Sequence, residues 1–388
     1  MTRIFGDLER KYLDQVLTSG HLSYYHEADS MTRRFEEAFA EKVGVKYAVV
    51  RNTAMTALGT AVTISGAGPG FEVICDPIVH FSAMATVYFN AVPRFADIKY
   101  GTYLMDPDSV RANITDRTKA LIVTNLWGLC AELDEIRRIC DEHGIFMIED
   151  CAHSMGSYWK GKHSGSYGDV GCFSFQQSKQ LTTGDGGMLT MSRSDLHDGL
   201  YGGWAFGGEV PTRYMALNYR MNEMTAAVGL AQLQRVDNYL DEYTENLRIM
   251  NEAVADCAWL RNREVPADAV QTGYIWACLW EGDQHGLEYE RFKKVVAEVG
   301  APLRFGFTMK PTYAHDFFAE GTKIYGHPDC PIRCPFYESD YTYQEGLCPV
   351  AEDLIWRIVS GGLIEVPTDE VKRRADLVRK AIEIAEKG

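Results

Sequence analysis

The stretch FSFQQSKQLTTGDGG, residues 173–187, places a single lysine among hydroxyl, amide and glycine residues. A loop lysine is usually solvated, and that is the simpler interpretation of Lys179. The alternative is a desolvated amine that bonds covalently to a carbonyl compound. Ser174 lies just upstream, and the turn after the lysine can offer hydroxyl and backbone N–H groups to an anion. The stretch therefore combines a candidate nucleophile with a candidate anion site.

Asp150 adds a carboxylate to this set. It ends the apolar run FMIED, and the carboxyl end of a parallel strand faces the crevice in which α/β sheets bind ligands. Taken alone, Asp150 is explained equally well as a helix cap or a loop charge. An aspartate, a lysine and an anion cradle are together what pyridoxal phosphate requires. The lysine forms a Schiff base with it, the carboxylate pairs with the pyridinium nitrogen, and the cradle holds the phosphate.

Composition and charge narrow the classes of function. The 388 residues are 46% hydrophobic and 24% charged, which is typical of a soluble enzyme with more than one domain. The net charge of −15 argues against nucleic acid or an anionic membrane as the main partner. The sequence contains no apolar run of about 20 residues, so we expect no membrane span. The charged start of the sequence is untypical of a signal peptide, so we expect a cytoplasmic protein.

The cysteines predict neither a disulfide framework nor a metal site. Ten are scattered along the chain without a CxxC pair, so we expect them to be reduced and mostly buried. Cys330, Cys334 and Cys348 are close in sequence, but no nearby histidine or cysteine completes a zinc spacing.

Short apolar runs alternate with helix-like segments through the first two-thirds of the chain. The runs are apolar along nearly their whole length, which predicts a mostly parallel sheet covered by helices on both faces. They cover residues 46–50, 71–77, 92–98, 119–127, 145–153, 170–175 and 187–191. Between two of them, residues 132–144 predict an amphipathic helix that ends at Gly144.

The last third is organised differently. From Asn222 to about Cys257 the sequence is helical in character and contains no proline. One helix of this length would run about 50 Å. It would lead from a large domain, residues 1–240, into a smaller α+β domain, residues 241–388.

Within that smaller domain we expect a strand–helix–strand pattern over residues 273–280, 288–300 and 301–307. Residues 308–347 are rich in Pro, Tyr, Gly and Cys and predict an irregular but ordered segment. A final helix follows Thr368, which can serve as its N-cap.

Nearly the whole chain resembles the DegT/DnrJ/StrS group of pyridoxal-phosphate aminotransferases, which act on keto-sugars and keto-cyclitols. IEDCAHSMGS resembles the family's aspartate motif, and SGSYGDVGCFSFQQSKQLTTGDGGM resembles its lysine motif. LNYRMNEMTAAVGLAQL and CPVAEDLIWRIVSGGLIEVPTDE resemble two further blocks. The resemblance implies the aspartate aminotransferase-like fold type I, with a large domain around a mostly parallel sheet and a smaller α+β C-terminal domain.

The resemblance also implies roles for residues in these motifs. Lys179 would form the Schiff base and move a proton between Cα of the donor and C4′ of the cofactor. Asp150 would hold N1, His153 would lie beside the ring hydroxyl, and Ser174 would contact the phosphate. Asn218 would reach the phosphate in the neighbouring subunit, because family members form homodimers with shared active sites.

Other site residues are assigned from weaker likenesses. Phe81 is expected to stack on the cofactor ring, with His80 as the alternative. Trp127 falls where the family has an aromatic residue lining the pocket, and core packing explains it equally well. Arg220 or Arg304 would face a donor carboxylate, or form a surface ion pair instead.

The turn RNTAMTAL, residues 51–58, departs from the family pattern. Ala54 and Met55 stand where the family usually has a Gly-Thr phosphate turn. Ala54 and Met55 still have backbone N–H groups that can bind a phosphate, and Thr53 or Thr56 would supply the hydroxyl group for it.

The presence of Lys179 favours transamination, because the family's dehydratases have histidine at that position. The donor implied is L-glutamate or L-glutamine. The sequence FQQSK resembles that of members which act on keto-cyclitols or make aminohydroxybenzoate in antibiotic pathways. Nucleotide-linked keto-sugars are the other acceptor class. The alternatives are a sugar dehydratase and a non-catalytic, cofactor-binding partner subunit. The altered turn supports the non-catalytic alternative, and the retention of Lys179, Asp150 and Ser174 argues against it.

Overall fold

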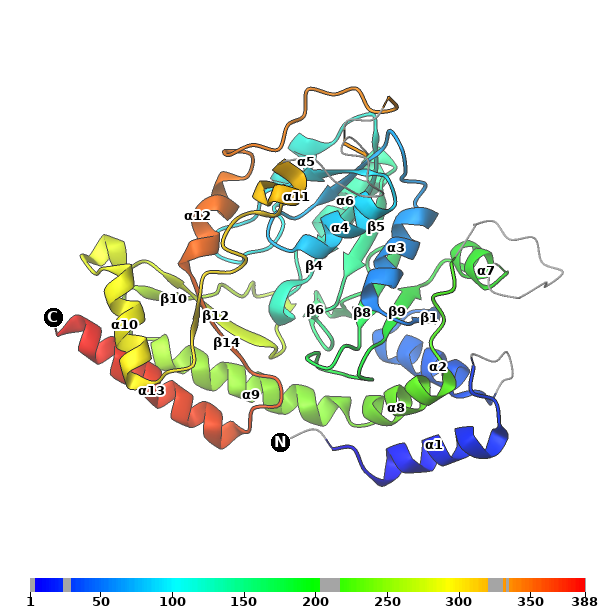
Figure 1. Cartoon of the computed structure of the whole chain (residues 1–388), viewed down its shortest axis with the longest axis horizontal. Coiled ribbons are helices and arrows are strands. Elements are labelled where there is room, and N and C mark those ends of the chain that lie inside the picture. Colours follow the sequence, from blue (N-terminus) through cyan, green and yellow to red (C-terminus); the bar gives the residue numbers. More distant parts are fainter. Residues whose placement is uncertain (1–3, 24–28, 203–216, 320–330, 333–334, 388) are drawn as a thin grey trace.

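A seven-stranded sheet organises the first half of the chain in this computed structural model, which describes residues 4–23, 29–202, 217–319, 331–332 and 335–387 (Figure 1). The strands are β1 (Tyr47–Arg51), β2 (Glu72–Cys75), β3 (Val92–Phe95), β4 (Thr118–Thr124), β5 (Phe146–Asp150), β8 (Val170–Ser174) and β9 (Gly187–Met191). Their order is β1-β9-β8-β5-β4-β2-β3. Every neighbouring pair from β8 to β3 is parallel, and β9 runs antiparallel to both β8 and β1. The predicted mostly parallel sheet is confirmed.

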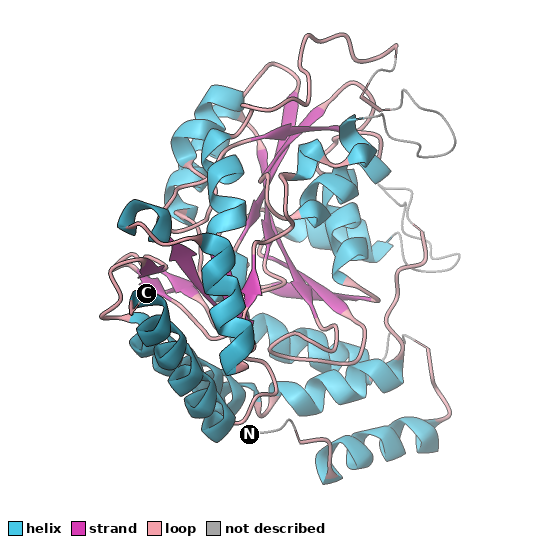
Figure 2. Ribbon diagram, turned by 60° about the vertical axis from the view of Figure 1, so that its left-hand side comes forward, coloured by secondary structure: helices cyan, strands magenta, loops and turns pink. Residues whose placement is uncertain are grey.

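Helices cover both faces of this sheet, because successive strand residues point to opposite sides. On β1, Val49 enters one hydrophobic cluster, while Ala48 and Val50 enter the other. Helices α3 (Ala54–Ile64) and α6 (Leu133–His143) pack in the first cluster, and α1 (Asp7–Ser19), α2 (Met31–Val43) and α8 (Glu223–Leu233) pack in the second. Figure 2 shows the strands between these helical layers. As predicted, α6 ends at Gly144, whose φ of 64° is left-handed.

The remaining elements of the first half are α4 (His80–Tyr88), α5 (Pro107–Asn113), the short helix η1 (Leu126–Gly128) and α7 (Ser194–Gly202). A small sheet consists of β11 (Ala269–Val270), β6 (Tyr158–Trp159) and β7 (Lys162–His163), in that order.

The segment predicted as one helix from Asn222 to Cys257 forms two helices, so that expectation was wrong. Helix α8 ends at Leu233, and α9 (Val236–Val254) begins after a turn at Gln234 and Arg235. The guanidinium of Arg235 reaches across to the buried carboxylate of Glu9 on α1, at 2.8 Å. The break therefore falls where a long-range ion pair forms, and no proline or glycine marks it.

A second, antiparallel sheet has the order β10-β12-β14-β13. Its strands are β10 (Leu260–Asn262), β12 (Ile275–Trp280), β13 (Arg304–Phe305) and β14 (Ile358–Gly362). Helices α9, α10 (Tyr289–Val299) and α13 (Thr368–Glu386) pack against it in a third hydrophobic cluster. Helices α9 and α13 lie side by side (Figure 1). The predicted strand–helix–strand pattern is present, with a short last strand.

The other elements of this part are η2 (Gly282–His285), η3 (Thr312–Ala314), α11 (Asp316–Ala319) and α12 (Pro349–Arg357). The predicted cap of the last helix was wrong. Pro367 is the N-cap of α13, and Thr368 is its first residue, with a hydroxyl that bonds to Glu242 Oε1 at 3.3 Å.

The predicted domain boundary between residues 240 and 241 falls inside α9. Leu240 packs in the cluster under the large sheet, and Leu247 packs in the cluster under the second sheet. One continuous helix thus joins the two packing regions, and the division into domains 1–240 and 241–388 stays a proposal.

Cys330 and Cys334 lie outside the described residues, and Cys348 is buried. The described ranges contain no cluster of three or more His, Cys, Asp or Glu side chains that could hold a metal ion. In the same ranges, no helix combines the length and the apolar character that a membrane crossing needs.

Candidate active site

Asp150 lies at the carboxyl end of β5, in the middle of the large sheet, where Thr124 of β4 and Cys172 of β8 are its neighbours. Its side chain is 2% exposed, and Oδ1 accepts a hydrogen bond from the backbone N–H of Ala152 at 3.0 Å. Burial raises the pKa of Asp150, while that hydrogen bond and the positive charge of Lys179 lower it. A cation facing this carboxylate would favour its ionised form.

Lys179 lies in the connection between β8 and β9 and is half-buried rather than fully buried. Its Nζ donates to Tyr274 Oη at 3.0 Å. The ring of Tyr274 in turn stacks on His153, with centroids 4.6 Å apart and planes 24° apart. The structure thus brings Lys179 and His153 together through Tyr274, which the sequence reasoning missed. Its only sequence signal is its place just before an apolar strand.

His153 has a free ring nitrogen. Nδ1 is buried and has no hydrogen-bond partner among the described residues. Burial lowers the pKa of His153 well below its usual value, and the charges of Lys179 and Arg263 lower it further. The imidazole is therefore neutral at physiological pH, with Nδ1 available to a bound group.

The expected phosphate cradle is assembled from three segments. Ser174 at the end of β8 pairs in register with Gly187 at the start of β9. A Cβ atom on Gly187 would lie 2.5 Å from the carbonyl carbon and oxygen of Thr53, so only glycine allows this close approach. Ala54 and Met55 are the first two residues of α3 and are half-buried. The N–H groups of a first helical turn lack intrahelical partners and favour an anion.

The hydroxyls of this turn cap the helix. Thr53 Oγ1 accepts from the backbone N–H of Thr56 at 3.1 Å, and Thr56 Oγ1 donates to Asn52 Oδ1 at 2.7 Å. The threonines therefore order the start of α3, and phosphate binding by the backbone of Ala54 and Met55 stays a prediction.

The segment that carries Asn218 runs beside the same turn in its own chain. The carbonyl of Tyr219 accepts from the backbone N–H of Asn52 at 2.9 Å. Asn218 is exposed, and its Oδ1 accepts from the backbone N–H of half-buried Arg220 at 3.3 Å. A contact of Asn218 with the phosphate in a second subunit stays a prediction.

Phe81 and His80 begin α4 and differ in their surroundings. Phe81 is 48% exposed, on the same exposed stripe of α4 as Met84 and Tyr88. His80 is half-buried, and its Nδ1 forms a hydrogen bond with Thr312 Oγ1 at 3.0 Å. Stacking of either residue on a cofactor ring stays a prediction.

Trp127 lies in η1 and is 1% exposed, with a left-handed φ of 51° that is unusual for a bulky residue. Its indole packs edge-on against Phe307 at 4.8 Å, and Nε1 has no hydrogen-bond partner among the described residues. The buried guanidinium of Arg263 donates to the carbonyl of Leu126 at 2.7 Å and so supports this turn. Arg304 is exposed on β13. Trp127 therefore packs in the core, and its role in lining the substrate pocket stays a prediction.

A second buried carboxylate, Asp76, follows β2. Its Oδ1 accepts from the backbone N–H groups of Ile78 at 3.1 Å and Val79 at 2.7 Å, and Oδ2 accepts from the hydroxyl of Thr124 at 2.6 Å. Burial raises the pKa of Asp76 to about 6, and the charge of Asp150 contributes to the increase. Asp76 thus orders the turn that leads to α4.

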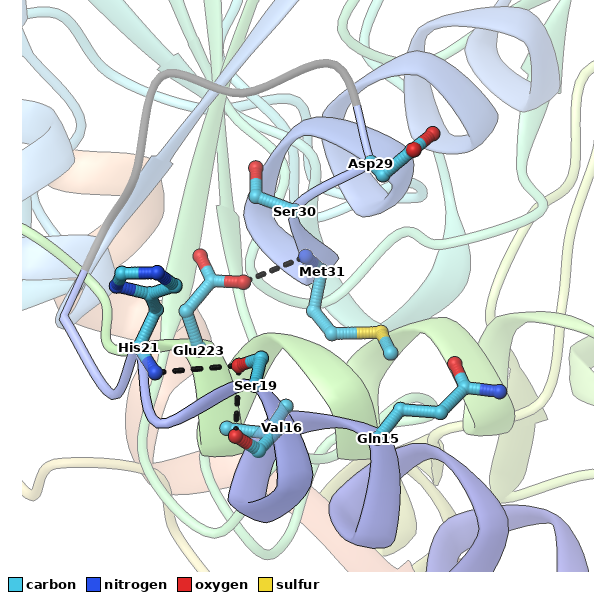
Figure 3. A pocket seen from close by; sticks show the side chains of 8 residues that line it. All are labelled: Gln15, Val16, Ser19, His21, Asp29, Ser30, Met31 and Glu223. Atoms are coloured by element: carbon cyan, nitrogen blue, oxygen red, sulfur yellow. Dashed lines mark hydrogen bonds between the residues drawn. The ribbon is translucent and has the colours of Figure 1, made fainter.

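A separate pocket lies between α1 and the start of α2 (Figure 3). Gln15, Val16, Ser19, His21, Asp29, Ser30, Met31 and Glu223 line it. The carboxylate of Glu223 is already bonded to the backbone N–H groups of Met31 and Thr32. The pocket contains none of the predicted site residues and is not part of the candidate active site.

Residues 4–376 match the DegT/DnrJ/EryC1/StrS aminotransferase family. The chain belongs to this family. The predicted resemblance is confirmed.

Two curated relatives illustrate the range of this aminotransferase family. The chain is 38% identical over 232 residues to GDP-perosamine synthase of Caulobacter vibrioides, and the match covers 58% of this chain. It is 32% identical over 321 residues to the L-glutamine:2-deoxy-scyllo-inosose aminotransferase of Streptomyces kanamyceticus, covering 78% of this chain and 74% of that enzyme. The matches span less than two thirds of the GDP-perosamine synthases of Caulobacter vibrioides and Vibrio cholerae, at 62% and 64% of their lengths.

Solved structures of aminotransferases share the fold along the whole chain. An aminotransferase from Psychrobacter cryohalolentis superposes with a TM-score of 0.83 at 25% identity, covering 100% of this chain and 99% of that one. A 3-amino-5-hydroxybenzoic acid synthase superposes with a TM-score of 0.83 at 23% identity, covering 99% and 98%. The predicted fold type I is therefore confirmed.

Proposed function

We propose that this chain is a pyridoxal-phosphate-dependent aminotransferase that moves an amino group from L-glutamate or L-glutamine to a keto-sugar or keto-cyclitol. The observation that carries the proposal is that Asp150 ends β5 within reach of the charge of Lys179, while Lys179 and His153 both contact Tyr274. A position at this edge is where α/β sheets bind ligands.

The chemistry of these residues fits the cofactor. Asp150 is a buried carboxylate near the charge of Lys179, and it would face the ring nitrogen. The unpartnered Nδ1 of His153 would face the ring hydroxyl. Ser174 and the first turn of α3 would hold the phosphate. When bound, pyridoxal phosphate supplies an electron sink for the carbanion left when the donor loses a proton.

The residues of the chain supply the remaining steps. Lys179 would hold the cofactor covalently, and its amine would move the proton between Cα of the donor and C4′. Asp150 as an anion would keep the ring nitrogen protonated. Trp127 and Arg220 are proposed to contact the substrates, Trp127 from the strained turn of η1 and Arg220 from the segment beside α3.

The names of the relatives support two acceptor classes. One relative is a GDP-perosamine synthase, and another uses L-glutamine and 2-deoxy-scyllo-inosose. We therefore propose a role in surface-sugar or antibiotic biosynthesis, in the cytoplasm. The decisive assay is a panel of nucleotide-linked keto-sugars and keto-cyclitols, each offered with glutamate and with glutamine. A protein that binds cofactor but converts none of them would favour the non-catalytic alternative.

Reduction with borohydride tests the site itself. The cofactor should become fixed to Lys179, as read by peptide mapping, and an adduct on any other lysine would contradict the assignment. Lys179→Arg keeps the charge but cannot form or exchange the covalent bond, so activity should be lost even where cofactor still binds. Lys310→Arg, at an exposed ion pair with Asp316, is the matched control.

We also propose a homodimer with shared active sites. The exposed apolar stripe of Phe81, Met84 and Tyr88 on α4 supports a contact between the two subunits through this helix. Hybrid dimers of one Lys179→Arg subunit and one Asn218→Ala subunit test the sharing. If Asn218 completes the partner's site, each hybrid keeps one intact site and regains activity; if it serves its own site, both sites are damaged.

A further inference from the structure

Tyr274 joins the two functional side chains that come from different parts of the large sheet. Its hydroxyl accepts from Lys179 Nζ at 3.0 Å, and its ring stacks on His153. The side chain is 6% exposed. A buried tyrosine that both stacks on one site residue and bonds to another restricts the positions of both.

The backbone before Tyr274 is held by two close contacts. A Cβ atom on Gly128 would lie 1.8 Å from the carbonyl oxygen of Thr272, and a Cβ atom on Gly273 would lie 1.8 Å from the carbonyl oxygen of Tyr243. The N–H of Thr272 also donates to the carbonyl of Gly128 at 2.9 Å. Glycine at both positions lets the segment before Tyr274 lie between η1 and α9. These contacts restrict the position of the Tyr274 side chain.

Gln180 extends the same arrangement. Its side chain is 1% exposed, and Nε2 donates to the carbonyl of His153 at 3.1 Å and to the hydroxyl of Thr272 at 3.4 Å. Gln180, the residue next to Lys179, therefore bonds both to the segment of His153 and to the segment just before Tyr274. Hydrogen bonds thus join the β8–β9 connection that carries Lys179, the segment of His153 and the segment that carries Tyr274.

We propose that Tyr274 is a positioning residue that holds the free amine of Lys179 during proton transfer. The proposal rests on the proposed function. When the donor has displaced the lysine, the neutral amine takes the proton from Cα, becomes an ammonium group, and gives that proton to C4′. A hydroxyl within hydrogen-bond distance accepts from the ammonium group and keeps it from turning away between the two transfers.

Tyr274→Phe removes one oxygen atom and keeps the ring that stacks on His153, so the fold should be unchanged. The matched control is Tyr47→Phe, because Tyr47 also stacks on a histidine, His197, at 4.1 Å but lies on β1 at the far edge of the sheet. Thermal melting of both variants checks folding. Both should still fix pyridoxal phosphate to Lys179 on reduction.

The expected effect is specific to the lysine. In Tyr274→Phe, covalent attachment of pyridoxal phosphate to apoenzyme should slow by about tenfold, and the single-turnover rate with glutamine should fall by about 10- to 100-fold. KM should change little, and the deuterium isotope effect with α-deuterated glutamine should rise, because proton transfer becomes slower than the other steps. Tyr47→Phe should match the wild type in all four measurements.

The two proposals fail separately. If the wild type reacts with no donor, the proposed function is wrong, while the attachment rate still tests Tyr274. If the wild type is active and Tyr274→Phe matches Tyr47→Phe in attachment rate and isotope effect, the positioning role is overturned.

Discussion

Replacing Asp76 by asparagine tests whether this buried carboxylate is costly to the fold when it is ionised. Asparagine has nearly the same shape, and its oxygen can still accept from the N–H groups of Ile78 and Val79. Its amide can donate to the hydroxyl of Thr124, which reverses the direction of the present bond. The substitution therefore keeps the contacts and removes the charge.

The magnitude follows from the pKa of Asp76. Burial raises it from an ordinary 3.8 to about 6. The native state thus binds the proton more tightly than the unfolded state, so stability falls as the pH rises from about 4 to about 6 and stays lower above that. A difference of about two pH units corresponds to about 3 kcal/mol, at about 1.4 kcal/mol per unit. Asp76→Asn should be more stable than the wild type by up to that amount at pH 8, and nearly equal to it at pH 4.

The assay is the melting temperature of both proteins from pH 4 to pH 8, in the absence of added cofactor. Asp256→Asn is the control, since that side chain is exposed just after α9, and the substitution should give no pH-dependent difference. If Asp76→Asn melted below the wild type at pH 8, the three hydrogen bonds to the anion would outweigh its burial, and the reasoning would be refuted.

Three further predictions concern the cradle, the ring nitrogen and acid stability. Gly187→Ala places a methyl group 2.5 Å from the carbonyl of Thr53, so the dissociation constant for pyridoxal phosphate, measured by fluorescence titration, should rise by about tenfold or more. Asp150→Asn should slow the half-reaction with glutamate by orders of magnitude in stopped-flow absorbance, and near-normal turnover would contradict its placement. Although burial acts to raise it, the hydrogen bond with Arg235 brings the pKa of Glu9 to about 2. The ionised pair stabilises the fold at neutral pH and this contribution is lost as the pH falls from about 4.5 to about 2, so Glu9→Gln should flatten the acid-unfolding curve in that range.

The sheet could be predicted because burial on both faces leaves a direct record in the sequence. Each predicted apolar run overlaps a strand, and Asp150 ends its strand as expected. Lys179 was proposed as a site residue because its surroundings of hydroxyls and glycines are unusual. These features are local, and a few neighbouring residues determine them.

The features that were missed depend on residues far apart in the chain. The end of α8 coincides with the pairing of Arg235 and Glu9, and no local breaker precedes it. Tyr274 meets Lys179 across 95 positions, and its own neighbourhood indicates only a strand. Stacking of Phe81 on the cofactor ring stays a prediction; its 48% exposure depends on how α4 docks, which the local sequence does not record.

The separation of Lys179 and Tyr274 also has a consequence for synthesis of the chain. At about 5–20 residues per second, a ribosome adds the 95 intervening positions in on the order of 5–20 s. Strand β12, which follows Tyr274, lies between β10 and β14, and β14 ends only at Gly362. The strands of the large sheet can therefore leave the ribosome and collapse before the second half of the chain has been made. In a nascent chain, Lys179 is thus present before the tyrosine that bonds to it has been made.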